Sequence, residues 1–236
     1  LDFLLRSQNW SPDELVFYQE QKLKSIIEHA FNRVPFYKDL FRKHHLVPED
    51  FNHLEDLKKF PVISKDDLRN KNQEYVISDK INNLVRMNSS GSTGEPFTYY
   101  LSWNAYSMKY AAAIRGWTWM GYRLGDKYAK LSQNERSTGI KKIQDIINRC
   151  VYLYINDLSN KGIQNTISIL EREKPLFIRC YPDPLYFMAL VLKKIGKKIK
   201  GINGINTTGN ILFPEARKTI EEYFGCPVFD SYSCEG

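Results

Sequence analysis

Apolar residues recur at helical intervals through the first 83 residues of the chain. Ser11, Pro12 and Glu14 together form the signature of a capping box with proline at the first helical position. Pro35 ends this helix and opens another, and Ser64 caps a later start. The apolar positions of the first long helix are Leu15, Leu23, Ile26, Ile27, Ala30 and Phe31. We therefore expect a helical lead segment over residues 1–83.

From residue 84 onward, short runs rich in β-branched and aromatic residues alternate with helical segments. The strand-like runs are LVRM, FTYYLS, KYAKLS, VYLYI, LFIRC, GINGINT and PVFDSY. Strands that alternate with helices of this length predict a mainly parallel sheet with crossover helices. We therefore expect an α/β fold, with residues 84–236 forming one continuous domain after the lead segment.

Three of the connecting loops are unusually polar. They cover residues 89–94, 207–210 and 231–235, and each follows a predicted strand. Ligands of open parallel sheets bind outside the carboxyl ends of the strands. These loops are therefore the candidate binding segments.

The loop after residue 88 has the composition of a phosphate-binding segment. Its two glycines permit tight turns that expose backbone N–H groups, and its hydroxyl side chains add further donors. The residues are Ser89, Ser90, Gly91, Ser92, Thr93 and Gly94. The nucleotide-binding loop of P-loop enzymes is excluded, because Gly94 is followed by Glu95 and Pro96 and then by a strand. A plain hairpin connection remains an alternative.

Composition and charge exclude several other classes of protein. The chain has 236 residues, of which 42% are hydrophobic, so intrinsic disorder is excluded. Its apolar runs are too short to span a bilayer, and its first residues lack the features of a signal peptide. Four cysteines without metal-ligand spacing indicate reduced thiols in a cytoplasmic protein, with zinc as the alternative.

The net charge of +7 does not indicate a nucleic-acid partner. Lysines cluster in KKIGKKIKG, over residues 193–201, where they suit the end of a solvated helix. Aromatic residues are not interleaved with them, as they are in proteins that bind single strands by stacking. We therefore expect no nucleic-acid partner.

The segment SSGSTGEP resembles the phosphate-binding signature of the adenylate-forming enzymes, the acyl-CoA synthetase and ligase superfamily. The resemblance extends over residues 34–236 through PFYKDLF, LEDLKKFPVISKDDLR, RGWTWMGYRLGDK, KPLFIRCYPDPLYFMAL and TTGNILFPEARKTIEEYFGCPVFDSYSCEG. These segments are similar to the branch that contains phenylacetate–CoA ligase and the capsular polysaccharide biosynthesis ligase-like proteins. The resemblance implies that the α/β region is part of the large nucleotide-binding domain of such an enzyme.

Activity and cofactors follow from this resemblance. Enzymes of the superfamily bind ATP, Mg²⁺ and a small carboxylic acid, form an acyl-adenylate, and then pass the acyl group to a thiol such as that of coenzyme A. The resemblance therefore implies the N-terminal portion of an ATP-dependent carboxylate–AMP ligase, with a role in capsular or surface polysaccharide biosynthesis. A non-catalytic nucleotide- or acyl-binding module, or a subunit that needs a second chain, is the alternative.

The resemblance also assigns roles to individual residues. Residues 89–94 would hold the β- and γ-phosphates, and Glu235 would bind Mg²⁺, which prefers oxygen ligands. The adenine and acyl pocket would be lined by Thr208, Gly209, Asn210 and Tyr232. Tyr181, Pro182 and Trp117 are candidates for its wall. The chain departs from the family at Asn210, where Glu is common, at Ser233, where Gly is common, and at Phe97, where Lys is common.

The family usually continues for about as long again after the Mg²⁺ motif. That part supplies the ribose-binding Asp and the catalytic Lys, so the catalytic residues are unknown from this chain. We expect the 236-residue chain to be inactive alone, with a homodimer or a companion chain as routes to a complete site. A truncated chain, a split gene and a degenerate copy remain open, as do the acid, the thiol acceptor and the oligomeric state.

Overall fold

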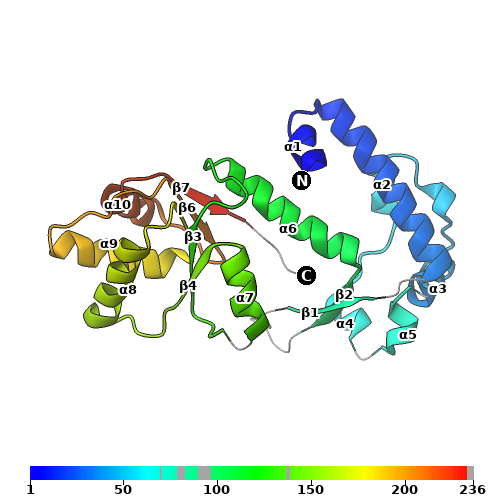
Figure 1. Ribbon diagram of the computed structural model, residues 1–236. Helices are drawn as coiled ribbons and strands as arrows, with labels where there is room; N and C mark the ends of the chain where they lie inside the picture. Colours follow the sequence, from blue (N-terminus) through cyan, green and yellow to red (C-terminus); the bar gives the residue numbers. More distant parts are fainter. Residues whose placement is uncertain (70, 79–82, 90–96, 137–138, 233–236) are drawn as a thin grey trace. The chain divides into compact units, whose positions relative to one another are not determined.

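The computed structural model describes residues 1–236 except 70, 79–82, 90–96, 137–138 and 233–236. The chain divides into two compact units, Leu1–Ala113 and the described residues of 114–234 (Figure 1). The division falls within helix α6 (Trp103–Thr118). The sequence-based domain boundary at residue 83 stays a prediction.

Helices make up most of the first unit. The capping box predicted at Ser11 is confirmed, because Glu14 N donates to Ser11 Oγ at 3.2 Å and Ser11 N donates to Glu14 Oε2 at 2.7 Å. Pro35 begins the next helix, and Ser64 accepts a hydrogen bond at the start of another. The elements are α1 (Asp2–Ser7), α2 (Pro12–Arg33), α3 (Pro35–Lys43), α4 (Lys65–Leu68), α5 (Gln73–Val76) and the 3₁₀ turns η1 (Pro48–Asp50) and η2 (Leu54–Lys59).

A small aromatic core holds these helices together. Phe41 is central to it, with its ring 5.9 Å from that of Phe31 and 5.3 Å from that of Phe60. Ile27 and Phe51 are buried in the same cluster. Leu23, Ile27 and Phe31 of α2 therefore face the turns that follow α3. Leu15 and Ile26, which the periodic pattern also includes, are exposed.

A two-stranded hairpin belongs to the same unit. Strands β1 (Val85–Asn88) and β2 (Thr98–Leu101) pair antiparallel, with Val85 opposite Leu101 and Asn88 opposite Thr98. The polar loop of residues 90–96 connects them, and it lies outside the described residues. The two strands predicted on either side of this loop are confirmed.

The second unit is an α/β sandwich. Its strands are all parallel in the order β4-β3-β5-β6-β7, as the alternating pattern predicts, so the expected α/β fold is confirmed. The strands are β3 (Tyr128–Ser132), β4 (Cys150–Tyr154), β5 (Phe177–Cys180), β6 (Gly204–Thr208) and β7 (Val228–Ser231). The crossover helices are α7 (Gly139–Ile147), α8 (Asn160–Glu173), α9 (Pro182–Lys194) and α10 (Pro214–Phe224).

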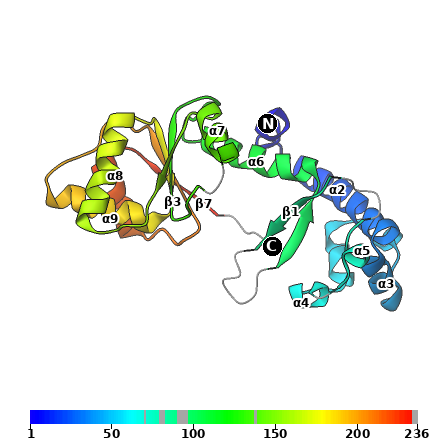
Figure 2. The ribbon, with the colours of Figure 1, turned by 60° about the horizontal axis from the view of Figure 1, so that its bottom comes forward.

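The crossover helices cover the two faces of this sheet unequally. The step from β3 to β4 runs along the sheet in the direction opposite to the later steps, so right-handed crossovers put α7 on the other face from α8, α9 and α10. Figure 2 shows α8 and α9 on one side of β3 and α7 on the other. The main core lies under α8, α9 and α10, where Ile178, Ile205 and Leu185 are fully buried.

Helix α7 buries one charged residue and exposes its isoleucines. Asp145 is buried and pairs with Arg136, whereas the isoleucines of the helix lie in solvent. These are Ile140, Ile143, Ile146 and Ile147, each between 59% and 76% exposed. An ion pair and contacts with β4 therefore hold α7 in place, in addition to its few apolar contacts.

None of the helices that the structure describes combines the length and the apolar character that crossing a bilayer requires.

Candidate functional site

Ser89 closes the base of the β1–β2 hairpin. Its backbone N–H donates to the Phe97 carbonyl at 2.9 Å, and its Oγ accepts from the Phe97 N–H at 2.9 Å. Next to this pair, Thr98 Oγ1 donates to Asn88 Oδ1 at 2.9 Å. Ser89 thus joins the two strands where the polar loop begins. The other predicted phosphate-binding residues, Ser90, Gly91, Ser92, Thr93 and Gly94, lie outside the described residues.

A pocket of about 290 Å³ lies at the carboxyl ends of β6 and β7. It brings together Gly209, Asn210 and Tyr232, three residues that the sequence assigned to the adenine and acyl pocket, with Thr208 at the end of the adjoining strand. Its other lining residues are Ile211, Leu212, Asp230 and Ser231. The Tyr232 side chain is 96% exposed, so both faces of its ring are open to a ligand. The predicted metal ligand Glu235 lies outside the described residues.

Gly209 is required by the shape of this pocket. Its φ is +92°, and a Cβ at this position would lie 2.4 Å from Cε1 of Tyr181. A side chain would therefore meet both an unfavourable backbone conformation and an aromatic ring. Tyr181, a predicted wall residue, lies just before α9 and packs against this glycine.

Asn210 contacts the first turn of α9. Its Nδ2 donates to Oδ2 of Asp183 at 2.7 Å. A glutamate at position 210, which the family commonly has, would set a second carboxylate against Asp183 and repel it. The hydrogen bond to Asp183 therefore fixes the Asn210 side chain at the edge of the pocket.

Two buried polar residues on β6 fix the neighbouring strand β7. Thr207 Oγ1 donates to Asp230 Oδ1 at 2.7 Å, and Asn206 Nδ2 donates to Ser231 Oγ at 2.6 Å. Both β6 side chains are buried, so these bonds hold the β7 side of the pocket wall at a defined position. Sequence reasoning missed Asp183 and Asp230, although the polar run that follows PVF marked the second of them.

The two other predicted wall residues belong to the core. Trp117 packs edge-on against Tyr122 and Tyr128, each at 5.1 Å between ring centroids. Pro182 is fully buried at the start of α9. Neither lines the pocket beside Gly209.

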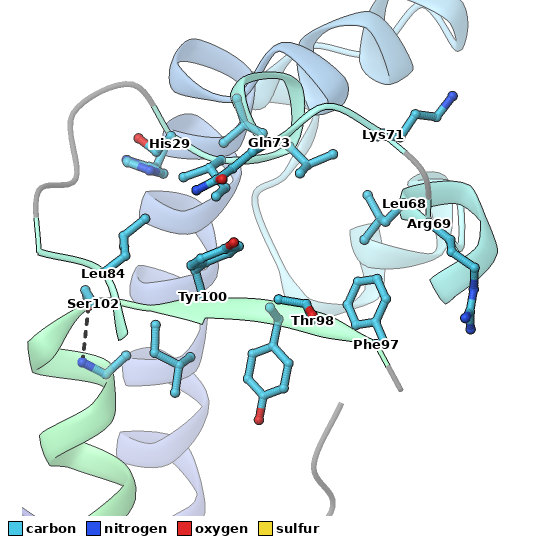
Figure 3. Close-up of a pocket in the computed structure, with 17 residues that line it drawn as sticks. His29, Leu68, Arg69, Lys71, Gln73, Leu84, Phe97, Thr98, Tyr100 and Ser102 are labelled. Carbon is cyan, nitrogen blue, oxygen red and sulfur yellow. Dashed lines mark hydrogen bonds between the residues drawn. The ribbon is translucent and has the colours of Figure 1, made fainter. Parts of the chain in front are cut away.

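The first unit contains a larger cavity of about 620 Å³ that the sequence did not indicate. Strand β2 forms one side, with Phe97, Thr98 and Tyr100, and Leu68 and Gln73 lie across from it (Figure 3). Ser78 also lines it, and its buried Oγ has no hydrogen-bond partner in the described part of the chain. The cavity belongs to the first unit and the pocket beside Gly209 to the second.

The fold of the chain is that of the adenylate-forming acyl-CoA ligases. A solved 2-hydroxyisobutyryl-CoA ligase, in an open conformation with 2-HIB-AMP and CoA, matches 94% of the chain and 54% of its own length, at a TM-score of 0.71 and 18% sequence identity. No protein-family model matches the chain.

Curated relatives point to the same group of proteins. The chain is 40% identical to phenylacetate–coenzyme A ligase of Escherichia coli (strain K12) over 87 residues, which are 36% of the chain and 20% of the ligase. It is 25% identical to Protein CapK of Staphylococcus aureus over 238 residues, covering 95% of the chain and 51% of CapK. The resemblance predicted from the sequence motifs is therefore confirmed, for a chain that spans about half the length of CapK and less of the ligase.

Proposed function

We propose that the chain is the nucleotide-binding part of an ATP-dependent ligase that joins AMP to a small carboxylic acid. The pocket beside Gly209 carries this proposal. It lies at the carboxyl edge of a parallel sheet, in a fold shared with a ligase solved with an acyl-adenylate. We propose coenzyme A as the acceptor of the acyl group, because a relative that is 40% identical over 87 residues is a coenzyme A ligase.

The residues of the pocket suit the parts of an acyl-adenylate. The open ring of Tyr232 offers a stacking surface for adenine. Gly209 makes room for the Tyr181 ring, and the Asn210 amide, held by Asp183, presents fixed polar atoms. Asp230 lines the pocket and has a carboxylate oxygen of the kind that Mg²⁺ prefers, so it joins Glu235 as a candidate ligand.

In this proposal the protein acts mainly by positioning. A carboxylate oxygen of the acid attacks the α-phosphorus, the bond to pyrophosphate breaks, and negative charge develops on the phosphoryl oxygens. Donors of the loop at residues 89–94 would meet that charge, because preorganised donors stabilise a transition state without reorganising. Mg²⁺ would supply charge neutralisation at the phosphates. We also propose a place in capsular or surface polysaccharide biosynthesis, which the resemblance of the sequence motifs to that branch implies.

Titration with ATP and Mg²⁺ tests the proposed site. Tyr232→Ala should weaken ATP binding about 5- to 150-fold, because stacking of one base on an aromatic ring contributes about 1–3 kcal/mol. Tyr110→Ala, an exposed tyrosine of α6 that does not line the pocket, is the matched control. Isothermal titration calorimetry that finds no ATP binding, or equal binding by both variants, would contradict the proposal.

Exchange of labelled pyrophosphate into ATP separates a ligase from a binding module. Exchange that depends on an added carboxylic acid supports adenylation. ATP binding without acid-dependent exchange favours the alternative, a module that binds nucleotide and does not turn over.

A further inference from the structure

One rung of the second unit's sheet places two cations side by side. Lys130 of β3 pairs in register with Tyr152 of β4 and with Arg179 of β5, and Arg179 pairs with Asn206 of β6. Adjacent strands lie about 4.8 Å apart, and side chains on one rung point to the same face. The stems of Lys130 and Arg179 therefore rise next to each other from the sheet.

These side chains lie on the face that α7 covers. The Arg179 guanidinium is 5.7 Å from the centre of the Trp117 ring, and Lys130 Nζ is 5.7 Å from the centre of the Tyr152 ring. Their strand neighbours Ala129 and Ile178 point the other way, into the core under α8, α9 and α10. The cations thus occupy the face of the sheet that α7 and the aromatic cluster around Trp117 cover.

The positive charge at this place exceeds the negative charge. Arg136 adds a third cation, 4.2 Å from the centre of the Tyr152 ring, and its charge is balanced by Asp145, with Nε donating to Oδ2 at 2.8 Å. Within the described ranges of the chain, Lys130 and Arg179 have no carboxylate at ion-pair distance. Burial first, and then Arg179 and Arg136, lower the pKa of Lys130. Desolvation and mutual repulsion of these two half-buried cations, which have no carboxylate partner among the described residues, therefore destabilise the fold.

The same face leads to the pocket beside Gly209. Asn206, next on the rung after Arg179, donates to Ser231, which lines that pocket. Ser231 lies two strands away from Arg179 and two residues further along β7, or about 12 Å at the usual strand spacing and rise. A ligand of the pocket would have to extend over this distance along the face to reach the cations with its far end.

We infer that Lys130 and Arg179 bind an oxyanion, and that the acid activated beside Gly209 carries a second acidic group, a carboxylate or a phosphate, which occupies this place. The inference rests on the proposed function, which makes the ligand a carboxylic acid. It adds that this acid is a dianion, whose second acidic group binds to Lys130 and Arg179. Local repulsion that a ligand relieves is a common property of binding sites.

The direct test is anion binding by matched variants. Lys130→Met keeps the length of the side chain and removes its charge, and Lys193→Met does the same at an exposed position on α9. Inorganic phosphate and adipate should each bind Lys130→Met at least about tenfold more weakly than they bind the parent chain, a difference of about 1.4 kcal/mol. Their affinity for Lys193→Met should equal their affinity for the parent chain. Arg179→Gln provides a second variant in case Lys130→Met does not fold. Equal binding by parent and variants overturns the inference.

Two further comparisons identify the source of the oxyanion. Adipate should bind more tightly than hexanoate, its monoanionic counterpart of equal length, and Lys130→Met should lose this preference. The affinity for ATP and Mg²⁺ should stay the same in Lys130→Met, and a loss of that affinity would overturn the substrate class by assigning the cations to a nucleotide phosphate. Failure of ATP to bind the parent chain would contradict the proposed function and would leave the phosphate result intact.

A thermal measurement distinguishes binding from a structural role. At constant ionic strength without phosphate, Lys130→Met should melt at or above the temperature of the parent, because the variant lacks the desolvated charge. Phosphate should then raise the melting temperature of the parent more than that of the variant. Lys130 would instead be structural if Lys130→Met melted several degrees below the parent and if phosphate raised both melting temperatures by the same amount.

Discussion

Gly209 and Tyr181 show at the scale of single residues how closely the pocket is fitted. Replacing Gly209 by Ala adds a Cβ that would lie 2.4 Å from the Tyr181 ring, in a backbone conformation with φ of +92°. We expect the free energy of unfolding to fall by about 1–3 kcal/mol, the usual magnitude for such strain. Urea unfolding followed by circular dichroism measures it.

Gly125 provides the control for this prediction. Its φ is +96°, but a Cβ there would meet nothing within 4 Å. Gly125→Ala should therefore show only the backbone part of the loss, and the excess at Gly209 should disappear when Tyr181 is also replaced by Ala. Equal losses at the two glycines would mean that the ring moves aside at little cost.

At the scale of residues, the sequence did not predict which residues far apart in the chain contact each other. Gly209, Asn210 and Tyr232 could be assigned to one pocket because motif and strand end coincide. Asp183 could not, since its hydrogen bond with Asn210 depends on how α9 packs. Likewise, the adjacency of Lys130 and Arg179 follows from strand register, which the residues alone do not reveal.

At the scale of elements, the β1–β2 hairpin depends on one serine. In Ser89→Ala the Phe97 N–H loses its side-chain acceptor at a partly buried place, which should cost about 0.5–2 kcal/mol. Ser89→Thr keeps the acceptor oxygen and should restore most of the stability. Amide hydrogen exchange at Phe97 measures the effect, and equal protection in all three chains would show that Ser89 does not hold the strands.

Helix α7 illustrates what a periodic pattern can and cannot tell. The helices predicted to begin at Pro12 and Pro35 are confirmed. In α7 the isoleucines recur at helical spacing, but they are exposed and the structure buries Asp145 instead. The ion pair with Arg136 decides the orientation, and its partner lies on a separate loop.

At the scale of the whole molecule, buried thiols should make the chain sensitive to alkali. Burial raises the pKa of Cys226 from 9.0 to about 12 and that of Cys180 still further. Above pH 9 the unfolded chain releases these protons while the folded chain keeps them, so stability falls as pH rises. The slope should reach up to about 1.4 kcal/mol per pH unit for each thiol.

Replacing one thiol isolates its contribution. Between pH 9 and 11, the unfolding free energy of Cys226→Ala should fall less steeply with pH than that of the parent chain. The difference in slope should be up to about 1.4 kcal/mol per pH unit, which corresponds to one proton. Other groups contribute equally to parent and variant, including Lys130, whose lowered pKa acts in the opposite direction. Urea unfolding at stepped pH values measures both chains, and parallel curves would show that Cys226 ionises without unfolding.

The class of the fold was predictable for the whole α/β region because strand and helix signals alternate with regular spacing. The order of the strands was not, since nothing in the local pattern distinguishes a strand added on the left of β3 from one added on the right. Chain length between strands is similar in both cases, and tertiary packing of the crossover helices selects the arrangement.

Strand order β4-β3-β5-β6-β7 lets the sheet grow in the order in which a ribosome releases its strands. Once β3 and β4 have paired, β5 joins the free side of β3, and β6 and β7 then each join an outer edge. No later strand has to insert between two that are already paired. Each partly synthesised chain can therefore keep the structure it has formed, which shortens the time that apolar strand edges face other nascent chains.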